Sequence, residues 1–241
     1  MKRLFLSVVL LATCVVATSA QIKYDVRASL GLSSMLSPSN ADTHVAFKIG
    51  ADASIPIGKS RFAVEPGLFF SQKGIRFNGY YLVGDIMSDA KYSTTLNYLE
   101  MPILATSKVH IGNDSYIIFK MGPYIAYGMK GKTTMKLRDT DYSRTFGQNH
   151  FREKCDYDNA AYDEDGNQIL CPKFNRFDAG VAYGIDFRIH RFIIGIEGEY
   201  GLLPVCDELY MGNTFENILS ACLFGSKPKN ISISFTTGYC F

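Results

Sequence analysis

The sequence of 241 residues lacks tryptophan and contains no long apolar run after its first 20 residues. A helix that crosses a membrane needs about 20 consecutive apolar residues, so the remaining chain offers no candidate for one. Hydrophobic residues still make up 47% of the chain and charged residues only 20%. That composition is too apolar for a disordered protein. A bundle of membrane helices and a disordered chain are therefore both excluded.

Motifs that carry common enzyme chemistry are also missing. The chain has no GxSxG, HExxH, phosphate-loop or Rossmann spacing, and it has no CxxC pair that would point to structural zinc. The run Asp163–Asn167 suggests calcium, but its glycine comes too early for an EF-hand loop and an Asp-Gly hairpin turn explains it equally well. The sequence predicts no catalytic residue, no metal site and no cofactor.

The amino terminus has the pattern of a secretory signal peptide. Lys2 and Arg3 precede an apolar stretch over Leu4–Val16, and small residues follow at Thr18–Ala20. A basic start, a short apolar run and small residues before the cleavage site are typical of such a signal. We expect a signal peptide at 1–20 and one barrel domain at 21–241. The alternatives are a first membrane helix, for which the run is too short, and a lipoprotein anchored at the first cysteine.

Charge is balanced in the chain that follows the predicted signal. The signal holds two basic and no acidic residues, so 23 residues of each sign remain. A nucleic-acid-binding protein needs a basic footprint. We therefore expect no nucleic-acid partner.

Five cysteines follow the predicted cleavage site. Export through an oxidising compartment permits disulfide bonds. Cys155 and Cys171 flank one polar insert, and Cys206 and Cys222 flank another, so we expect two local bridges, although four cysteines allow three pairings. Cys240 is left over, and we expect it to be a small residue that faces the interior.

Alternation of apolar and polar residues with a period of two is the strongest signal. In the segment 176–190, for example, Phe177, Val181 and Phe187 alternate with Asp178 and Arg188. This period is typical of a β-strand with two different faces. The pattern appears in eight segments: 24–34, 44–55, 61–73, 92–107, 116–130, 176–190, 192–202 and 231–241.

The connections between these segments alternate in length. Three are short and four are long; the long ones are 36–43, 77–91, 131–173 and 204–230. Short turns on one side and long loops on the other are typical of outer-membrane barrels. We predict an all-β fold: an eight-stranded antiparallel up-and-down transmembrane β-barrel with short periplasmic turns and long outer loops.

A soluble exported barrel would show the same alternation with its faces exchanged. The export signal, the even strand number, the aromatic residues on the apolar faces and the final Phe241 favour lipid outside the barrel. We therefore expect residence in the outer membrane, with membrane lipid as a partner.

The polar faces would then line a narrow lumen. Unpaired buried charge is costly, so these side chains are expected to pair, and eight strands leave a bore that side chains fill. This predicts a barrel whose lumen is filled by side chains, not an open pore. Asp25, Lys73, Lys130 and Arg176 are assigned to this lumen. The core of the predicted charge network is Arg27, Lys48, Asp52, Glu65, Glu100, Lys120, Asp178, Asp186, Arg188, Glu197 and Glu199.

Four stretches of the sequence follow the motifs of one protein family: Asn97–Leu104, Gly122–Tyr127, Ile196–Leu202 and Ile231–Phe241. In this order they resemble the YLEIP, GPY and RYxxGL strands and the LSLGYRF ending of the PorT-like outer-membrane β-barrel proteins of Bacteroidetes. The chain departs from the pattern at Glu199 and at Cys240, where basic residues are usual. The resemblance implies outer-membrane residence, an up-and-down barrel and no catalytic residues.

The function that we expect is a non-enzymatic membrane anchor or interaction protein that works through its outer loops. Three alternatives stay open. The resemblance implies a component of an envelope secretion apparatus, which would bind another envelope protein. A rim-located enzyme would use a pair such as Asp42 and His44, or His150. A narrow channel would conduct ions through the lumen.

Overall fold

The protein is described by a computed structural model. It describes residues 22–36, 42–58, 60–83, 85–112, 114–138, 140–146, 149–152, 161–162, 173–206 and 227–241. The predicted signal peptide at 1–20 lies outside these residues and stays a prediction. Within the described part, no helix is both long and apolar enough to cross a membrane.

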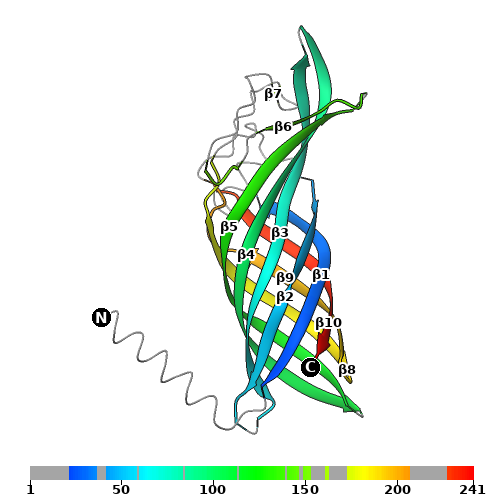
Figure 1. Ribbon diagram of the computed structural model, residues 1–241, viewed down its shortest axis with the longest axis vertical. Coiled ribbons are helices and arrows are strands. Elements are labelled where there is room, and N and C mark those ends of the chain that lie inside the picture. The colour runs from blue at the N-terminus through cyan, green and yellow to red at the C-terminus, as the bar shows by residue number, and fades with distance from the viewer. Residues whose placement is uncertain are drawn as a thin grey trace, which may run out of the picture.

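Eight antiparallel strands close into a ring (Figure 1). Each pairs with its neighbour along the ring, β1 pairs with β10, and the β2–β3 pairing completes the closure. The predicted eight-stranded up-and-down barrel is therefore confirmed. Its strands are β1 (Lys23–Leu36), β2 (His44–Pro56), β3 (Phe62–Val83), β4 (Ile86–Gly112), β5 (Ser115–Leu137), β8 (Phe177–Ile189), β9 (Phe192–Gly201) and β10 (Lys229–Cys240).

Three strands rise beyond the ring. β3, β4 and β5 contain 22, 27 and 23 residues, whereas β9 contains 10. Their upper parts, together with β6 (Ser143–Phe146) and β7 (Ala161–Tyr162), form a sheet that we call the extension. Figure 1 shows it standing above the barrel. The predicted loop at 77–91 is wrong, because β3 and β4 stay paired up to Val83 and Ile86.

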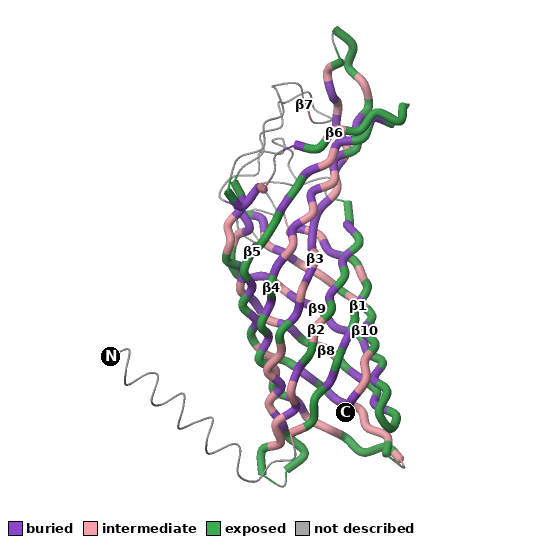
Figure 2. Tube along the Cα trace, in the orientation of Figure 1, coloured by how far each residue is buried: buried purple, intermediate pink, exposed green. Residues whose placement is uncertain are grey.

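The barrel wall is apolar outside and charged inside. Along each strand exposed and buried residues alternate, as the tube in Figure 2 shows. A row of large apolar side chains is exposed on every strand of the ring, and it includes Leu30, Ile49, Leu68, Ile103, Ile125, Ile185, Ile196 and Phe235. A continuous apolar outer surface of this size needs a covering of lipid or protein.

The polarity of the wall reverses along β5. In the barrel its outward residues are apolar, from Phe119 to Met129, and its inward residues include Lys120. Above Met129 the outward residues are polar, and the buried ones include Met135 and Leu137. The outward polar set is Lys130, Lys132, Thr134, Lys136 and Arg138. Such an exchange of faces is expected where the surroundings change from lipid to water.

A β-bulge makes this exchange possible on β5. The pairing with β4 moves from Tyr98–Gly128 to Asn97–Lys130, so Met129 is an extra residue and both Met129 and Lys130 are exposed. A bulge shifts the alternation by one residue. The assignment of Lys130 to the lumen is therefore wrong, because unbroken alternation was assumed across this position.

The same reversal occurs on β3 without a bulge. Leu68 and Phe70 point outward in the barrel, and Gln72 and Asn78 point outward above it. Gln72 donates a hydrogen bond to Asn97 at this level, with 3.0 Å between the amide nitrogen and oxygen. Polar residues on neighbouring strands thus mark one height around this side of the barrel.

Aromatic residues border the apolar surface at both ends. Tyr127 and Phe177 pack edge to face with 5.3 Å between ring centroids near the extension, and Phe192 and Tyr239 do so at 5.6 Å near the short turns. Tilted strands of about 11 residues between such borders give an apolar band of roughly 25 Å. That height matches the hydrocarbon layer of an outer membrane.

Deletion of Met129 and Lys130 together tests the role of the bulge, because deletion of Met129 alone would join Gly128 to Lys130 in regular alternation and keep the faces above it unchanged. With both residues removed, the alternation above Gly128 shifts by one residue, so Lys132 and Lys136 would turn toward the apolar side of the extension and Met135 would turn outward. We expect the extension to become protease-sensitive while the barrel keeps heat-modifiable mobility on a gel. Met129→Ala keeps the bulge and should behave like wild type. A deletion variant with a fully protease-resistant extension would contradict this explanation.

Candidate functional site

The lumen is the most polar enclosed part of the described structure. It is lined by alternate residues of the ring strands, and all eleven members of the predicted charge network are at most 8% exposed. Asp25 and Lys73, also assigned to the lumen, are buried there too. The structure thus brings the predicted residues into one enclosed space, where they form two linked clusters.

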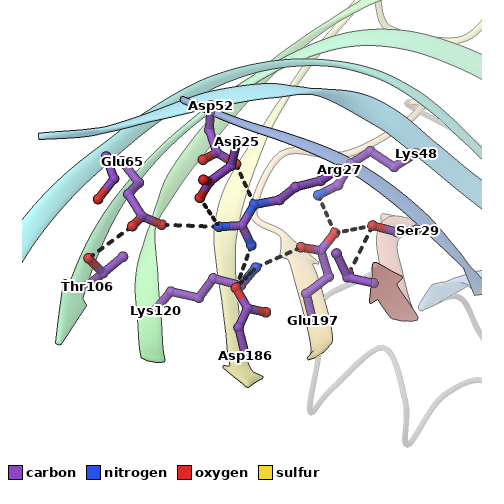
Figure 3. A network of polar contacts seen from close by, with 12 residues as sticks. Asp25, Arg27, Ser29, Lys48, Asp52, Glu65, Thr106, Lys120, Asp186 and Glu197 are labelled. Atoms are coloured by element: carbon purple, nitrogen blue, oxygen red, sulfur yellow. Dashed lines mark hydrogen bonds and ion pairs between the residues drawn. The ribbon is translucent and has the colours of Figure 1, made fainter. Parts of the chain in front are cut away.

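The lower cluster surrounds the guanidinium of Arg27 (Figure 3). Nε lies 2.7 Å from Asp52, and the other two nitrogens contact Asp186, Asp25 and Glu65. Planar guanidinium groups suit several carboxylates at once. Further ion pairs join Arg188 to Asp25 at 2.7 Å and Lys120 to Asp186 at 3.1 Å.

The upper cluster is organised by two lysines. Lys48 Nζ lies 2.6 Å from Glu199 and 2.7 Å from Glu197. Lys73 Nζ lies 2.7 Å from Glu199 and 3.0 Å from Glu100. Lys120 lies 3.3 Å from Glu197 and also contacts the lower cluster, so the ion pairs run continuously along the lumen.

Asp178 closes the upper end of the charged region. Its carboxylate accepts hydrogen bonds from Asn230 at 2.8 Å and from the Tyr124 hydroxyl at 3.2 Å. The ammonium group of Lys73 lies 4.5 Å from the centre of the Tyr124 ring. A ring face stabilises a cation that has lost its water.

Inward-facing glycines make room for these side chains. A Cβ atom on Gly195 would lie 2.1 Å from Asp186 Oδ1, and one on Gly184 would lie 2.8 Å from Lys120 Cε. Eight strands leave little interior width, so glycine at these positions is what allows charged side chains to cross the bore.

Two residues differ from their expected places around this network. Arg176 was assigned to the lumen but is half-exposed before β8, where it donates to the Tyr127 hydroxyl at 2.8 Å on the outer surface. The strand begins only at Phe177, so alternation does not extend to Arg176. Lys108 was not assigned to the network, yet its Nζ lies 3.7 Å from Glu65. Lys108 and Glu100 lie an even number of positions apart on β4, so their side chains share one face of the strand. This spacing could have identified Lys108 as a member of the network.

The described residues leave little open space around the charge network. The cavity among Arg27, Lys48, Asp52, Glu65 and Lys120 measures about 20 Å³. That volume holds about one water molecule. Larger hollows of about 400 and 540 Å³ lie on the apolar outer surface instead, beside Tyr183 and Ile185.

An apolar plug covers the outer end of the lumen. Phe151, Phe174, Val205 and Cys206, which follow or precede the ring strands, pack with upper wall residues that include Tyr98. Residue 128 is glycine, and the Phe151 ring fills the space that a side chain at this position would occupy. A plug of this kind separates the charged lumen from the outer solution.

His150 lies within the plug. Its amide donates to the Gly131 carbonyl at 3.0 Å, and its ring nitrogen Nε2 lies 2.8 Å from the Thr133 hydroxyl. Burial lowers the pKa of His150 to about 4, so the imidazole is neutral at neutral pH. A neutral ring avoids placing a charge against Phe174, whose ring centroid is 5.8 Å away.

The rim histidine at the start of β2 does not form the suggested pair with Asp42. His44 Nδ1 contacts the Val45 carbonyl and Nε2 lies 3.2 Å from the Thr95 hydroxyl. Asp42 forms backbone hydrogen bonds with Arg76. Both ring nitrogens of His44 are thus engaged in contacts that hold it in place.

The predicted disulfides fall largely outside the described part. Cys155, Cys171 and Cys222 lie outside it, whereas Cys206 is buried in the plug. No disulfide bond joins cysteines within the described part, so the structure gives the two bridges no support and they stay predictions. The run Asp163–Asn167 also lies outside the described residues. Within them, no cluster of His, Cys, Asp or Glu is suited to hold a metal ion.

The family described as "Outer membrane protein beta-barrel domain" matches residues 19–207. The chain belongs to this family. The protein therefore resides in the outer membrane. Barrels of this kind have short turns on the periplasmic side and longer connections outside, so we expect the extension to lie outside. The apolar outer surface of the ring is the surface that faces lipid.

Solved structures that are similar to this chain include two proteins of low sequence identity. Ail, the attachment invasion locus protein of Yersinia pestis, is 11% identical, with 91% of this chain and 98% of that chain covered and a TM-score of 0.37. Neisserial surface protein A is 10% identical, with 92% and 99% covered and a TM-score of 0.37. No curated protein matches the chain.

Replacement of Arg27 by glutamine tests the lumen network. The change leaves Asp52, Asp186 and their neighbours without their central cation, and loss of one partner of a buried ion pair costs about 3–5 kcal/mol. We expect a clearly lower urea midpoint for the gel mobility shift in lipid vesicles. The double variant Arg27→Gln, Asp186→Asn should recover part of the decrease in the urea midpoint. An unchanged midpoint for Arg27→Gln would mean that the network adds nothing to stability.

Proposed function

We propose that the protein is a non-enzymatic anchor that holds an interaction surface outside the outer membrane. The observation that carries this proposal is the filled and covered lumen beneath a raised sheet. Ion pairs, a cavity of about one water molecule and an apolar plug all oppose passage through the barrel. The raised sheet is then the part of the described structure that is available to a partner.

The extension is built to stand rigidly in water. Phe77 and Tyr92 stack with 4.9 Å between ring centroids, and the Arg144 guanidinium donates to the Tyr81 hydroxyl at 2.9 Å. These rings belong to a buried cluster that includes Met135. A packed inner face gives the extension a core of its own, separate from the lumen.

The tip of the β3–β4 hairpin carries exposed apolar side chains. Val83, Ile86 and Met87 are 48%, 70% and 50% exposed, and they lie more than ten residues beyond Gln72, where the apolar outer surface ends. Apolar side chains grouped at a projecting, water-exposed tip favour contact with a protein partner. We infer that this tip is the contact point.

A role in an envelope secretion apparatus is a narrower form of the same proposal. The four PorT-like stretches support it, and it names the partner as another envelope protein. A channel is less favoured, because the lumen is filled. A rim enzyme is less favoured, because the contacts of His44 leave neither ring nitrogen directed toward an acid partner.

Photo-crosslinking in intact cells tests the proposal. A photoreactive residue at Ile86 should give one discrete protein adduct, whereas the same residue at Ile103, which faces lipid and is 50% exposed, should give none. Loss of secreted proteins after deletion of the gene would support the narrower secretion role. Stepwise conductance of the purified barrel in planar bilayers, with no adduct at Ile86, would overturn the proposal.

A further inference from the structure

The outward face of the extension carries an excess of basic residues. Five basic side chains of β4, β5 and the residue after β5 lie on it or at its upper end, beside three exposed acidic residues, Asp85, Asp89 and Asp141, and the structure gives none of the five an ion pair within the residues it describes. The lumen, by contrast, pairs nearly every charge. The basic residues are Lys91, Lys130, Lys132, Lys136 and Arg138.

Two of these lysines oppose each other directly. Lys91 and Lys136 are partners in the β4–β5 register, and both are exposed. Like charges at directly opposed positions of a sheet are destabilising. A bound anion between them would remove this repulsion, and in the described structure Asp89, two residues from Lys91 on the same face, forms no ion pair with either lysine.

The basic face begins where the lipid-facing surface ends. Met129 is the last apolar outward residue of β5, and Lys130 and Lys132 are the next outward residues above it. At a rise of about 3.3 Å per residue, Lys130 to Lys136 cover about 20 Å along the strand. The lower lysines thus lie at the height of lipid headgroups, and the upper ones lie beyond it.

We propose that this face binds the phosphate groups of anionic lipids in the outer leaflet. The lysines point away from the barrel, toward neighbouring lipids, and continue the strip that already contacts acyl chains. Basic residues beside a membrane attract anionic headgroups. The hydroxyl group of Thr134, on the same face of β5, adds a hydrogen-bond donor for phosphate oxygens. The proposal does not depend on the hairpin tip or on its partner.

Lipid retention in nanodiscs tests the proposal with the full chain. Wild-type barrel is placed in neutral phospholipid that contains either lipid A, a phosphorylated glycolipid, or its dephosphorylated form, and bound lipid is counted by native mass spectrometry. We expect at least fivefold more lipid A than dephosphorylated lipid per barrel. Added salt should reduce this excess, because the attraction is electrostatic.

Matched variants assign the binding to this face. The triple variant Lys130→Gln, Lys132→Gln and Lys136→Gln should retain at least fivefold less lipid A than the wild type. One lysine near an anionic surface increases binding by about fivefold. The control Lys23→Gln, Arg61→Gln and Arg191→Gln removes three exposed charges from the opposite rim and should retain lipid A. Heat-modifiable mobility confirms that each variant is folded.

Three outcomes would overturn the proposal. Equal retention by the triple variant and the wild type would show that these lysines do not bind lipid. Displacement of lipid A by inorganic phosphate at low concentration would indicate a site for small anions instead of lipid. Binding of polyglutamate without any preference for lipid A would assign the face to an acidic protein.

Discussion

The exclusion of charge from lipid is the constraint on which this structure depends. An eight-stranded wall has two faces, and a bilayer accepts apolar side chains on only one of them. The opposite face must hold every charge of the spanning segments within a narrow bore. Arg27, Lys48, Lys73 and Lys120 therefore lie among carboxylates, and glycines such as Gly195 leave space for them.

Above the bilayer the same strands show the reverse arrangement, with polar side chains outside and apolar side chains inside. Water accepts polar side chains outside, so the extension turns apolar residues such as Phe77 and Tyr92 inward and lysines outward. On β5 the change requires one extra residue, Met129, whereas β3 achieves it through its residue types alone. The bulge and the reversal together mark the boundary between lipid and water in the chain itself.

Much of the barrel could be predicted from the sequence because lipid imposes a simple pattern. The eight segments and the inward charges follow from a period of two that continues through each span. The extension was predicted as a loop at 77–91 because its polarity is inverted and its strands have no lipid-facing side. A strict period of two predicts that Lys130 faces the lumen. The residue types around Met129 do not reveal the bulge that turns Lys130 outward. Lys108 was missed because the predicted strand ended one residue too early.

The direct test of this account is a scan of solvent exposure along the outward face of β5. A spin label is placed in turn at Phe119, Met121, Ile125, Tyr127, Lys130, Lys132 and Lys136 in vesicles, and its collisions with oxygen and with a water-soluble nickel complex are compared. The account predicts oxygen-rich, nickel-poor surroundings up to Tyr127 and the reverse from Lys132 onward. Nickel access at all seven positions would contradict it, because the apolar face would then be in water.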